Sequence, residues 1–217
     1  GAFKGPYRKA DVFCHLYPLA EDLIPFIILL AKTVGLNESS ILGLRRDCLQ
    51  EIDGQYVLWF RKARGSAGLY RKIIPAGGLF SPVTLLEVLH KITAPLVRYA
   101  KPEFQELLFL GFTVKGRGRE PVKPLDTVYI KAQMNRAGGW CAENNLTDAH
   151  GRQIRISLRR FRVYYLSLRY KKHGQLSKVS RDAAHTLAQT TVSYVANDST
   201  KHIHERSVEA GIRAARE

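Results

Sequence analysis

Apolar side chains recur every three to four residues in several stretches of the chain, which is the period of an amphipathic helix. Residues 18–34 show this period clearly, and Gly35 is expected to end the helix in a left-handed conformation. The same period predicts helices over residues 81–99, 125–145 and 154–174. The pattern therefore indicates a protein that is mainly α-helical.

Capping and helix-breaking residues refine these predictions. Ser81 is a good cap and Pro82 suits the first helical position, whereas Pro95 should kink or end that helix. The helix over residues 125–145 should break near residues 138–139, where two glycines are adjacent. The predicted apolar faces are Leu125, Val128, Tyr129 and Ala132 in this helix, and Leu158, Phe161, Tyr165 and Leu168 in the next, which Ser157 caps and Gly174 ends.

The period changes after a short helix that Asn37 is expected to cap. One strand should end near Ile52, the residues at 53–54 form a turn, and a second strand covers residues 56–60. A third strand is expected over residues 70–75. Together they predict a small three-stranded antiparallel sheet.

Composition indicates one domain with a polyanionic partner. The chain has 217 residues, of which 45% are hydrophobic and 24% charged, which is ordinary for a single globular domain. Its formal net charge of +15 favours nucleic acid, ahead of a membrane surface, as the partner. The apolar run at residues 23–31 contains Pro25 and is too short to span a bilayer.

The three cysteines, Cys14, Cys48 and Cys141, are far apart and have no metal-binding spacing. They predict neither a disulfide framework nor a structural zinc, and they fit a reducing cytosol.

Basic residues gather where loops are predicted, and there they can contact a phosphate backbone. Residues 61–72 contain Lys62, Arg64, Arg71 and Lys72 beside two glycines that lack the spacing of a nucleotide-binding loop. A second basic turn, residues 115–119, contains Arg117. The alternative is that these residues form a solvated charged surface.

The stretch DAAHTLAQTTVSYVA, residues 182–196, has the features of a functional site. A short helix is expected to end near Ala184, which leaves His185 in a turn and places Tyr194 in a following helix. The alternative is a buried tyrosine on an amphipathic helix and a histidine in a turn.

This stretch resembles the LGHSSISTTQIY box of the tyrosine recombinases, the phage integrase family. His185 stands at the histidine of that box, and Tyr194 at its nucleophile. Residues 35–49 resemble a second box of the family, TGLRISELLALRWSDI. There the first catalytic arginine falls on Asn37 and the glutamate on Ser40.

Residues 154–174 resemble the HxLRHTFAT box of the same family. Arg159 stands at its arginine, and the box histidine falls on Ile156. The resemblance implies an α+β, mainly α-helical catalytic domain with a small three-stranded antiparallel sheet. It implies catalysis without metal or nucleotide, in which Tyr194 forms a 3′-phosphotyrosyl intermediate, Arg159 and His185 stabilise the phosphoryl group, and Lys62 protonates the leaving 5′ oxygen, with Lys72 as its competitor.

The expected function is site-specific recombination of double-stranded DNA, in the integration, excision or transposition of a mobile element. Residues expected to bind the DNA are Arg45, Arg64, Arg71, Lys72, Arg117 and Arg160. The resemblance implies that the protein forms a tetramer on DNA. It also implies a bacterial cytoplasmic protein that associates with the nucleoid. Residues 1–217 would be the single catalytic domain, with an exchange helix at 199–217 and without the N-terminal DNA-clamping domain.

Two other functions stay open. Because the family arginine and histidine are replaced at Asn37 and Ile156, the protein could be a DNA-binding pseudo-recombinase that does not cut. The third candidate is an RNA-binding or architectural basic protein, against which stands the lack of an aromatic RNA-recognition motif in the sequence.

Overall fold

The computed structural model describes residues 15–62, 68–112, 122–183 and 188–196, together with positions 205 and 213. Four of the sequence-based predictions fall outside these residues: those on Arg64, Arg117 and His185, and that on the segment 199–217 apart from two single positions.

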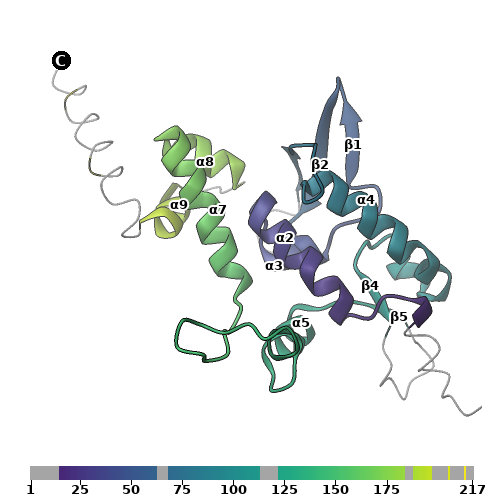
Figure 1. The fold of residues 1–217 in the computed structure, drawn as a ribbon. Coiled ribbons are helices and arrows are strands. Elements are labelled where there is room, and N and C mark those ends of the chain that lie inside the picture. Colours follow the sequence, from purple (N-terminus) through teal and green to yellow (C-terminus); the bar gives the residue numbers. More distant parts are fainter. Residues whose placement is uncertain are drawn as a thin grey trace, which may run out of the picture.

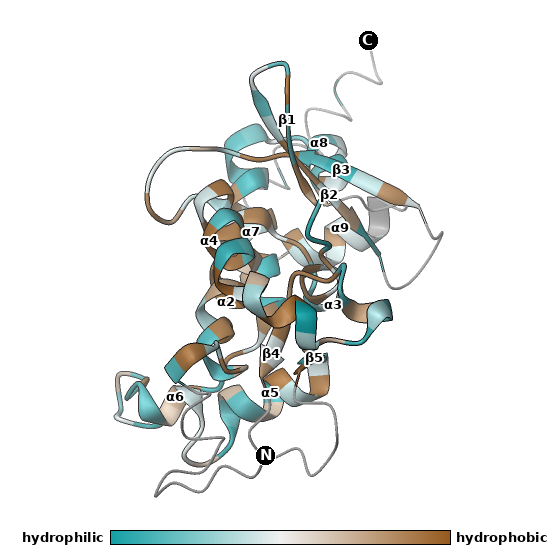
Figure 2. Ribbon diagram, turned by 90° about the vertical axis from the view of Figure 1, so that its right-hand side faces the viewer, coloured by the Kyte–Doolittle hydropathy of each residue, from teal (hydrophilic) through white to brown (hydrophobic). Residues whose placement is uncertain are grey.

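Helix α2 (Ile24–Val34) lies at the centre of the molecule and contacts α3 (Glu38–Leu42), α4 (Pro82–Thr93) and α7 (Leu158–His173). A short 3-10 helix, η1 (Glu21–Leu23), precedes it, so the helical region predicted from residue 18 begins a few residues later. The face of α2 toward these helices is buried at Ile24, Ile27, Leu30, Ala31 and Val34. Full burial of one such aliphatic side chain contributes about 1.5–3 kcal/mol, and Figure 2 shows hydrophobic residues gathered where α2 and α4 meet.

The predicted three-stranded sheet is confirmed. Strands β1 (Leu49–Ile52), β2 (Gln55–Arg61) and β3 (Leu69–Ile73) are antiparallel in that order. Asp53 and Gly54 form the tight turn between the first two strands, and both have positive φ angles of 51° and 71°.

The predicted break at Pro95 is also confirmed. Ser81 caps α4 by accepting a hydrogen bond from the backbone N–H of Thr84, and the chain continues from Thr93 as the 3-10 helices η2 (Ala94–Tyr99) and η3 (Pro102–Phe104).

A second, two-stranded sheet was not predicted. It pairs β4 (Leu110–Phe112) with β5 (Val122–Pro124). Each strand has three residues, too few to show an alternating pattern in the sequence.

The predicted break near residues 138–139 is confirmed. The predicted apolar face of this region is correct at Leu125, which is buried, and at Tyr129, which packs against the core, but wrong at Val128 and Ala132, which are exposed. The chain forms α5 (Thr127–Asn135) and α6 (Trp140–Glu143). In α5 the buried residues are Ile130 and Met134, whereas the Val128 side chain is 77% exposed. The helix packs on η1, α3 and α6, and Ile130 and Met134, four residues apart, are buried there, so Val128 faces solvent.

The buried stripe predicted for α7 is confirmed at Leu158 and wrong at Leu168, whereas Phe161 and Tyr165 are half-buried and pack against the core clusters. Leu168 is 46% exposed, and the residues that α7 buries are Leu158, Arg162, Leu166, Ser167 and Tyr170. The reason is that α7 packs on α2 and also on two helices that follow it, α8 (Leu176–Asp182) and α9 (Ala188–Val195). This contact turns the line through Arg162, Leu166 and Tyr170 inward.

Helices α7, α8 and α9 form a group beside α2 (Figure 1). They enclose a core cluster of their own, made of Leu166, Tyr170, Val179, Ala183 and Val195. Nowhere in the described part of the chain is a helix long and apolar enough to cross a membrane. The fold therefore places α9, which carries Tyr194, against the helix that carries Arg159 and Arg162.

Candidate active site

A cavity of about 520 Å³ opens between the group of α7 and α9 on one side and α3 and α5 on the other. Its lining contains several residues with chemistry that could act on a phosphate: Asn37, Glu38, Ser39, Thr127, Lys131, Arg159, Arg162 and Tyr194. These residues come from four elements that are distant in the sequence. The cavity unites the predicted nucleophile Tyr194 with Arg159 and with the position of the substituted family arginine.

Arg162 is the most buried cation on this cavity, with only 5% of its surface exposed. Its Nη1 donates to the carbonyl oxygen of Gly35 at 2.6 Å and its Nη2 to that of Ala183 at 3.2 Å. The guanidinium carbon lies 5.5 Å from the centre of the Tyr194 ring. Burial lowers the pKa of Arg162, and the charge and hydrogen bond of Tyr194 oppose that shift.

Arg159 lies one helical turn before Arg162 and is exposed. Its guanidinium carbon is 5.8 Å from the centre of the same Tyr194 ring. Residues three apart on a helix share a face. Two cations of α7 therefore flank the tyrosine, one held in place by backbone carbonyls and one open to the cavity.

Lys62 directly follows β2, and its ammonium lies 4.6 Å from the centre of the Tyr70 ring. Partial burial lowers its pKa; the charge of Tyr70 opposes the shift and that of Arg162 adds to it. An ammonium with a lowered pKa gives up its proton more readily, as a general acid must.

Lys72, the predicted competitor of Lys62, has a different environment. Its Nζ donates to the carbonyl oxygens of Val34 at 2.8 Å and Asp182 at 3.0 Å. It also lies 4.4 Å from the centre of the Tyr165 ring. Burial lowers its pKa to about 7, against the opposing charge of Asp182. Lys72 lines a separate cavity of about 700 Å³ and joins the end of α2 to the end of α8.

The two substituted family positions differ in their surroundings. Asn37 lines the cavity but caps α3, because its Oδ1 accepts a hydrogen bond from the backbone N–H of Ser40 at 2.8 Å. Ile156 lies before the start of α7 and packs against the main core. Its backbone N–H and C=O are both bonded to the side chain of Asn135. Neither position supplies a cation.

Lys131, on α5, is a cation of the cavity that the sequence did not indicate. Its Nζ lies 2.9 Å from Oε2 of Glu38, and the Lys131 side chain is 59% exposed while that of Glu38 is 14% exposed. The other carboxylate oxygen of Glu38, Oε1, is buried and accepts no hydrogen bond from the described residues. The pair therefore holds a largely exposed ammonium against a carboxylate of which, among the described residues, only one oxygen has a bonding partner.

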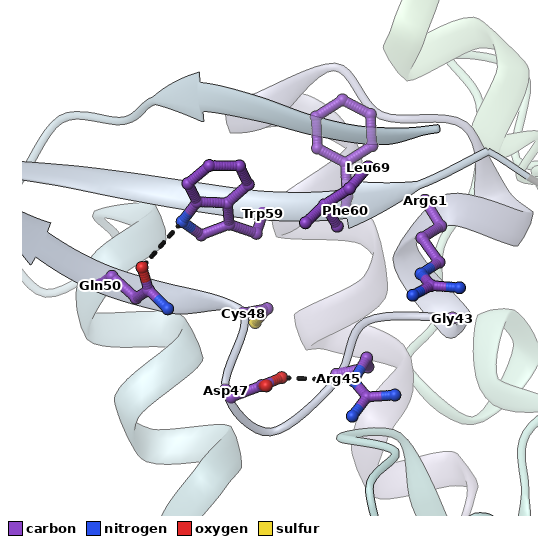
Figure 3. Close-up of a pocket in the computed structure, with 9 residues that line it drawn as sticks. All are labelled: Gly43, Arg45, Asp47, Cys48, Gln50, Trp59, Phe60, Arg61 and Leu69. Atoms are coloured by element: carbon purple, nitrogen blue, oxygen red, sulfur yellow. Dashed lines mark hydrogen bonds and ion pairs between the residues drawn. The ribbon is translucent and has the colours of Figure 1, made fainter. Parts of the chain in front are cut away.

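The remaining predicted DNA-binding residues within the described ranges do not line the cavity. Arg71 and Arg160 are exposed on β3 and α7. Arg45 is held by ion pairs to Asp47 at 3.4 Å and Glu106 at 2.5 Å. Arg45 and Arg61 both line a different pocket, of about 350 Å³, and Figure 3 shows the ion pair between Arg45 and Asp47 there.

The described residues contain no group of three or more histidine, cysteine, aspartate or glutamate side chains that could hold a metal ion. Cys48 and Cys141 are buried thiols without a disulfide. Burial raises the pKa of Cys48 to about 12, so this thiol is not a nucleophile near neutral pH.

Sequence reasoning missed Arg162 and Lys131. Arg162 was one basic residue among several on α7, although its spacing of three residues from Arg159 equals that of histidine and arginine in the HxLR box. Lys131 had no signal at all, because only the packing of α5 against α3 brings it to the cavity.

Comparison with known proteins supports the fold. No family model matches the chain, and no curated protein matches it. Among solved structures, the post-cleavage complex of the site-specific recombinase XerH with a palindromic difH substrate superposes with a TM-score of 0.54 and 18% identity over 87% of this chain. The pre-cleavage XerH complex gives a TM-score of 0.52 and 17% identity over 79% of this chain.

The recombinase XerA gives a TM-score of 0.51 and 12% identity over 88% of this chain. The chain spans 44% and 42% of the two XerH chains and 64% of XerA. It therefore corresponds to a part of each of these proteins, and it has the fold of a tyrosine-recombinase catalytic domain.

Proposed function

We propose that this protein breaks and rejoins double-stranded DNA at specific sites, with Tyr194 as the nucleophile. The observation that carries the proposal is the contact of Tyr194 with two arginines of α7, at 5.8 Å and 5.5 Å from the ring centre, in one open cavity. Two guanidinium groups beside a hydroxyl suit phosphoryl transfer, because they stabilise the negative charge that develops on the non-bridging oxygens. The net charge of +15 supports a DNA partner.

In the proposed reaction the Tyr194 oxygen attacks the scissile phosphorus, and the bond from phosphorus to the 5′ oxygen breaks. A 3′-phosphotyrosyl bond forms, the proton of the Tyr194 hydroxyl passes to solvent, and Lys62 gives its own proton to the leaving 5′ oxygen. A 5′ hydroxyl of another strand then attacks the phosphotyrosine, which restores the tyrosine and joins the strands. His185 would hydrogen-bond the same phosphoryl group, as the resemblance implies.

We also propose a revised register for the HxLR box. In the first alignment Arg159 is the box arginine and Ile156 replaces the histidine. A shift by three residues puts Arg162 at the box arginine and Arg159 at the box histidine. Support comes from the cavity, which both arginines line and Ile156 does not. With this register the chain lacks only one cation of these boxes, the arginine that Asn37 replaces.

The alternative is a DNA-binding protein of the same fold that does not cut. The observation in its favour is Asn37, whose amide oxygen caps α3 where the family has a catalytic arginine. If one preorganised donor is worth about 10²–10³ in rate, its loss slows cleavage strongly unless another group substitutes.

The two functions are separated by trapping a covalent adduct. A duplex that binds tightly is first selected from a randomised pool, and a nick is then placed beside the scissile phosphate so that the cleaved fragment diffuses away. Wild type should form a denaturant-resistant adduct with this DNA. Tyr194→Phe should form none while it binds the intact duplex as tightly, because only the hydroxyl is removed. Tight and selective binding without any adduct from wild type would favour the alternative.

Assembly is a further part of the proposal. We expect a tetramer on DNA in which residues 199–217 dock on a neighbouring protomer, as the family resemblance implies. Deletion of this segment should leave binding to a single site intact and abolish larger complexes in native gels. An unfolded truncation would show instead that the segment belongs to the core of its own protomer.

A further inference from the structure

We infer that Lys131 is a catalytic residue, the cation that takes the place of the family arginine absent at Asn37. The inference rests on the proposed function and concerns the wall of the cavity opposite Arg159 and Arg162. On that wall, formed by α3 and α5, Lys131 carries the one positive charge among the described lining residues. A phosphate in the cavity would then have cations on both sides.

The position of the ammonium supports this role. Lys131 Nζ is 2.9 Å from the carboxylate of Glu38, and Glu38 is the direct neighbour of Asn37 in the chain. The ammonium therefore lies beside the residue from which the family arginine would project. It comes from α5, so the substitution at position 37 and its replacement lie on different elements.

Glu38 explains how a long side chain is held there. One of its oxygens binds Lys131, and the other is buried without a hydrogen-bond donor from the described residues. A carboxylate in that condition retains a cation strongly, because loss of the partner would leave a buried charge unpaired. Lysine has three N–H donors, so one can stay on Glu38 while the others point to a phosphate oxygen.

Exposure of the two side chains agrees with this division of roles. Glu38 is 14% exposed and acts as the fixed anchor, whereas Lys131 is 59% exposed and remains accessible to a ligand. A carboxylate alone in the cavity would repel a phosphate. Its pairing with Lys131 removes that repulsion, and the two arginines then give the cavity its net positive charge.

The first experiment measures the rate of adduct formation on the nicked duplex. Lys131→Ala should slow trapping by about 10²–10³, the effect of removing one preorganised donor. Lys131→Arg should stay within about tenfold of wild type, because the charge and donors remain. Lys32→Ala is the matched control, an exposed helical lysine that lines none of the cavities described above, and it should trap at the wild-type rate.

Two double variants test the position and the mechanism. Asn37→Arg should rescue Lys131→Ala by much more than it accelerates wild type, because the two cations would serve the same phosphate. Glu38→Gln combined with Lys131→Ala should be as slow as Lys131→Ala alone, which excludes the unpaired carboxylate as the cause. Equal rates for Lys131→Ala and the Lys32→Ala control would overturn the inference and leave the proposed function intact.

A binding experiment needs no chemistry. In a Tyr194→Phe background, Lys131→Ala should make the plot of log affinity against log salt less steep by about 0.9, the loss of one phosphate contact. The Lys32→Ala control should leave the slope unchanged. If wild type forms no adduct but the slope changes in this way, the proposed cleavage fails and the phosphate contact of Lys131 stands. An unchanged slope would contradict that contact.

Discussion

Arg162 should contribute to stability as well as to the site, and the structure gives the size of this effect. Its guanidinium makes two hydrogen bonds to carbonyls, at 2.6 Å to Gly35 and 3.2 Å to Ala183. A hydrogen bond from a charged donor contributes about 1.5–3 kcal/mol, so two give about 3–6 kcal/mol. Burial of the charge, which lowers the pKa of Arg162, reduces the net value. Arg162→Met should therefore lower the free energy of unfolding by about 3 kcal/mol.

The matched control is Arg159→Met, one helical turn away. Arg159 is exposed, and the described structure gives it no hydrogen bond to a backbone carbonyl. Its substitution should change the free energy of unfolding by less than about 0.5 kcal/mol, as for most surface positions. Arg162→Lys should fall between the two, because an ammonium keeps the charge but not the planar fork that reaches two carbonyls.

The assay is urea unfolding followed by far-ultraviolet circular dichroism, with the midpoint and the slope fitted separately. A difference of about 3 kcal/mol is a large part of the 5–15 kcal/mol that typically holds a domain folded, so it is easily measured. If both methionine variants unfold at the same urea concentration, the carbonyl contacts of Arg162 do not stabilise the protein.

Three further predictions concern stability and binding. Burial lowers the pKa of Lys72 from 10.5 to about 7, so between these values the unfolded chain binds one more proton than the folded chain, and stability should rise with pH from about pH 7 to 9, where the raised pKa of Cys48 begins to cancel the rise. Lys72→Met should abolish this rise in urea titrations at each pH. Gly35→Ala should destabilise the protein by more than about 1 kcal/mol in the same assay, since φ is 71° and the new Cβ would collide with the Tyr165 ring. Affinity for duplex DNA should fall with salt at a slope of about −0.9 per phosphate contact, and a slope near zero in fluorescence anisotropy would contradict phosphate-driven binding.

Elements with a strong local signal could be predicted from the sequence. Gly35 ends α2 at φ 71°, Asn37 caps α3, and the Asp53–Gly54 turn joins β1 to β2. In each case the residue favours one backbone conformation by its own chemistry, without help from distant parts of the chain. The three strands and the break at Pro95 followed in the same way.

Elements that depend on tertiary packing could not be predicted. The two-stranded sheet of β4 and β5 consists of three residues a side, and Val128 looked apolar in a helix that buries Ile130 instead. The direction in which a helix faces is decided by its neighbours, and a sequence pattern with few apolar residues does not fix it.

Some residues of the candidate site could likewise be predicted from the sequence, and others could not. Tyr194 and Arg159, which line the cavity, were predicted from their resemblance to family boxes, although the revised register moves Arg159 from the box arginine to the box histidine. Arg162 was missed because an arginine on a basic helix is expected to be solvated, and only the packing of α7 on α2, α8 and α9 buries it. The buried arginine violates the rule that long charged side chains stay exposed, and such violations are expected where a fold serves a function.

The buried side chains of Lys72 and Arg162 link the end of α2 to the end of α8. Lys72 binds the carbonyls of Val34 and Asp182, and Arg162 binds those of Gly35 and Ala183, so each cation joins one of two consecutive carbonyls at the end of α2 to one at the end of α8. The chain from Ala183 leads into α9. Helix α8, which packs against α9, is therefore joined to the central helix by two buried basic side chains, one of which also lies against Tyr194, the proposed nucleophile. A shift of α8 relative to α2 would disturb the setting of Tyr194 and the arginine beside it together, which makes the alignment of the site depend on the packing of the core.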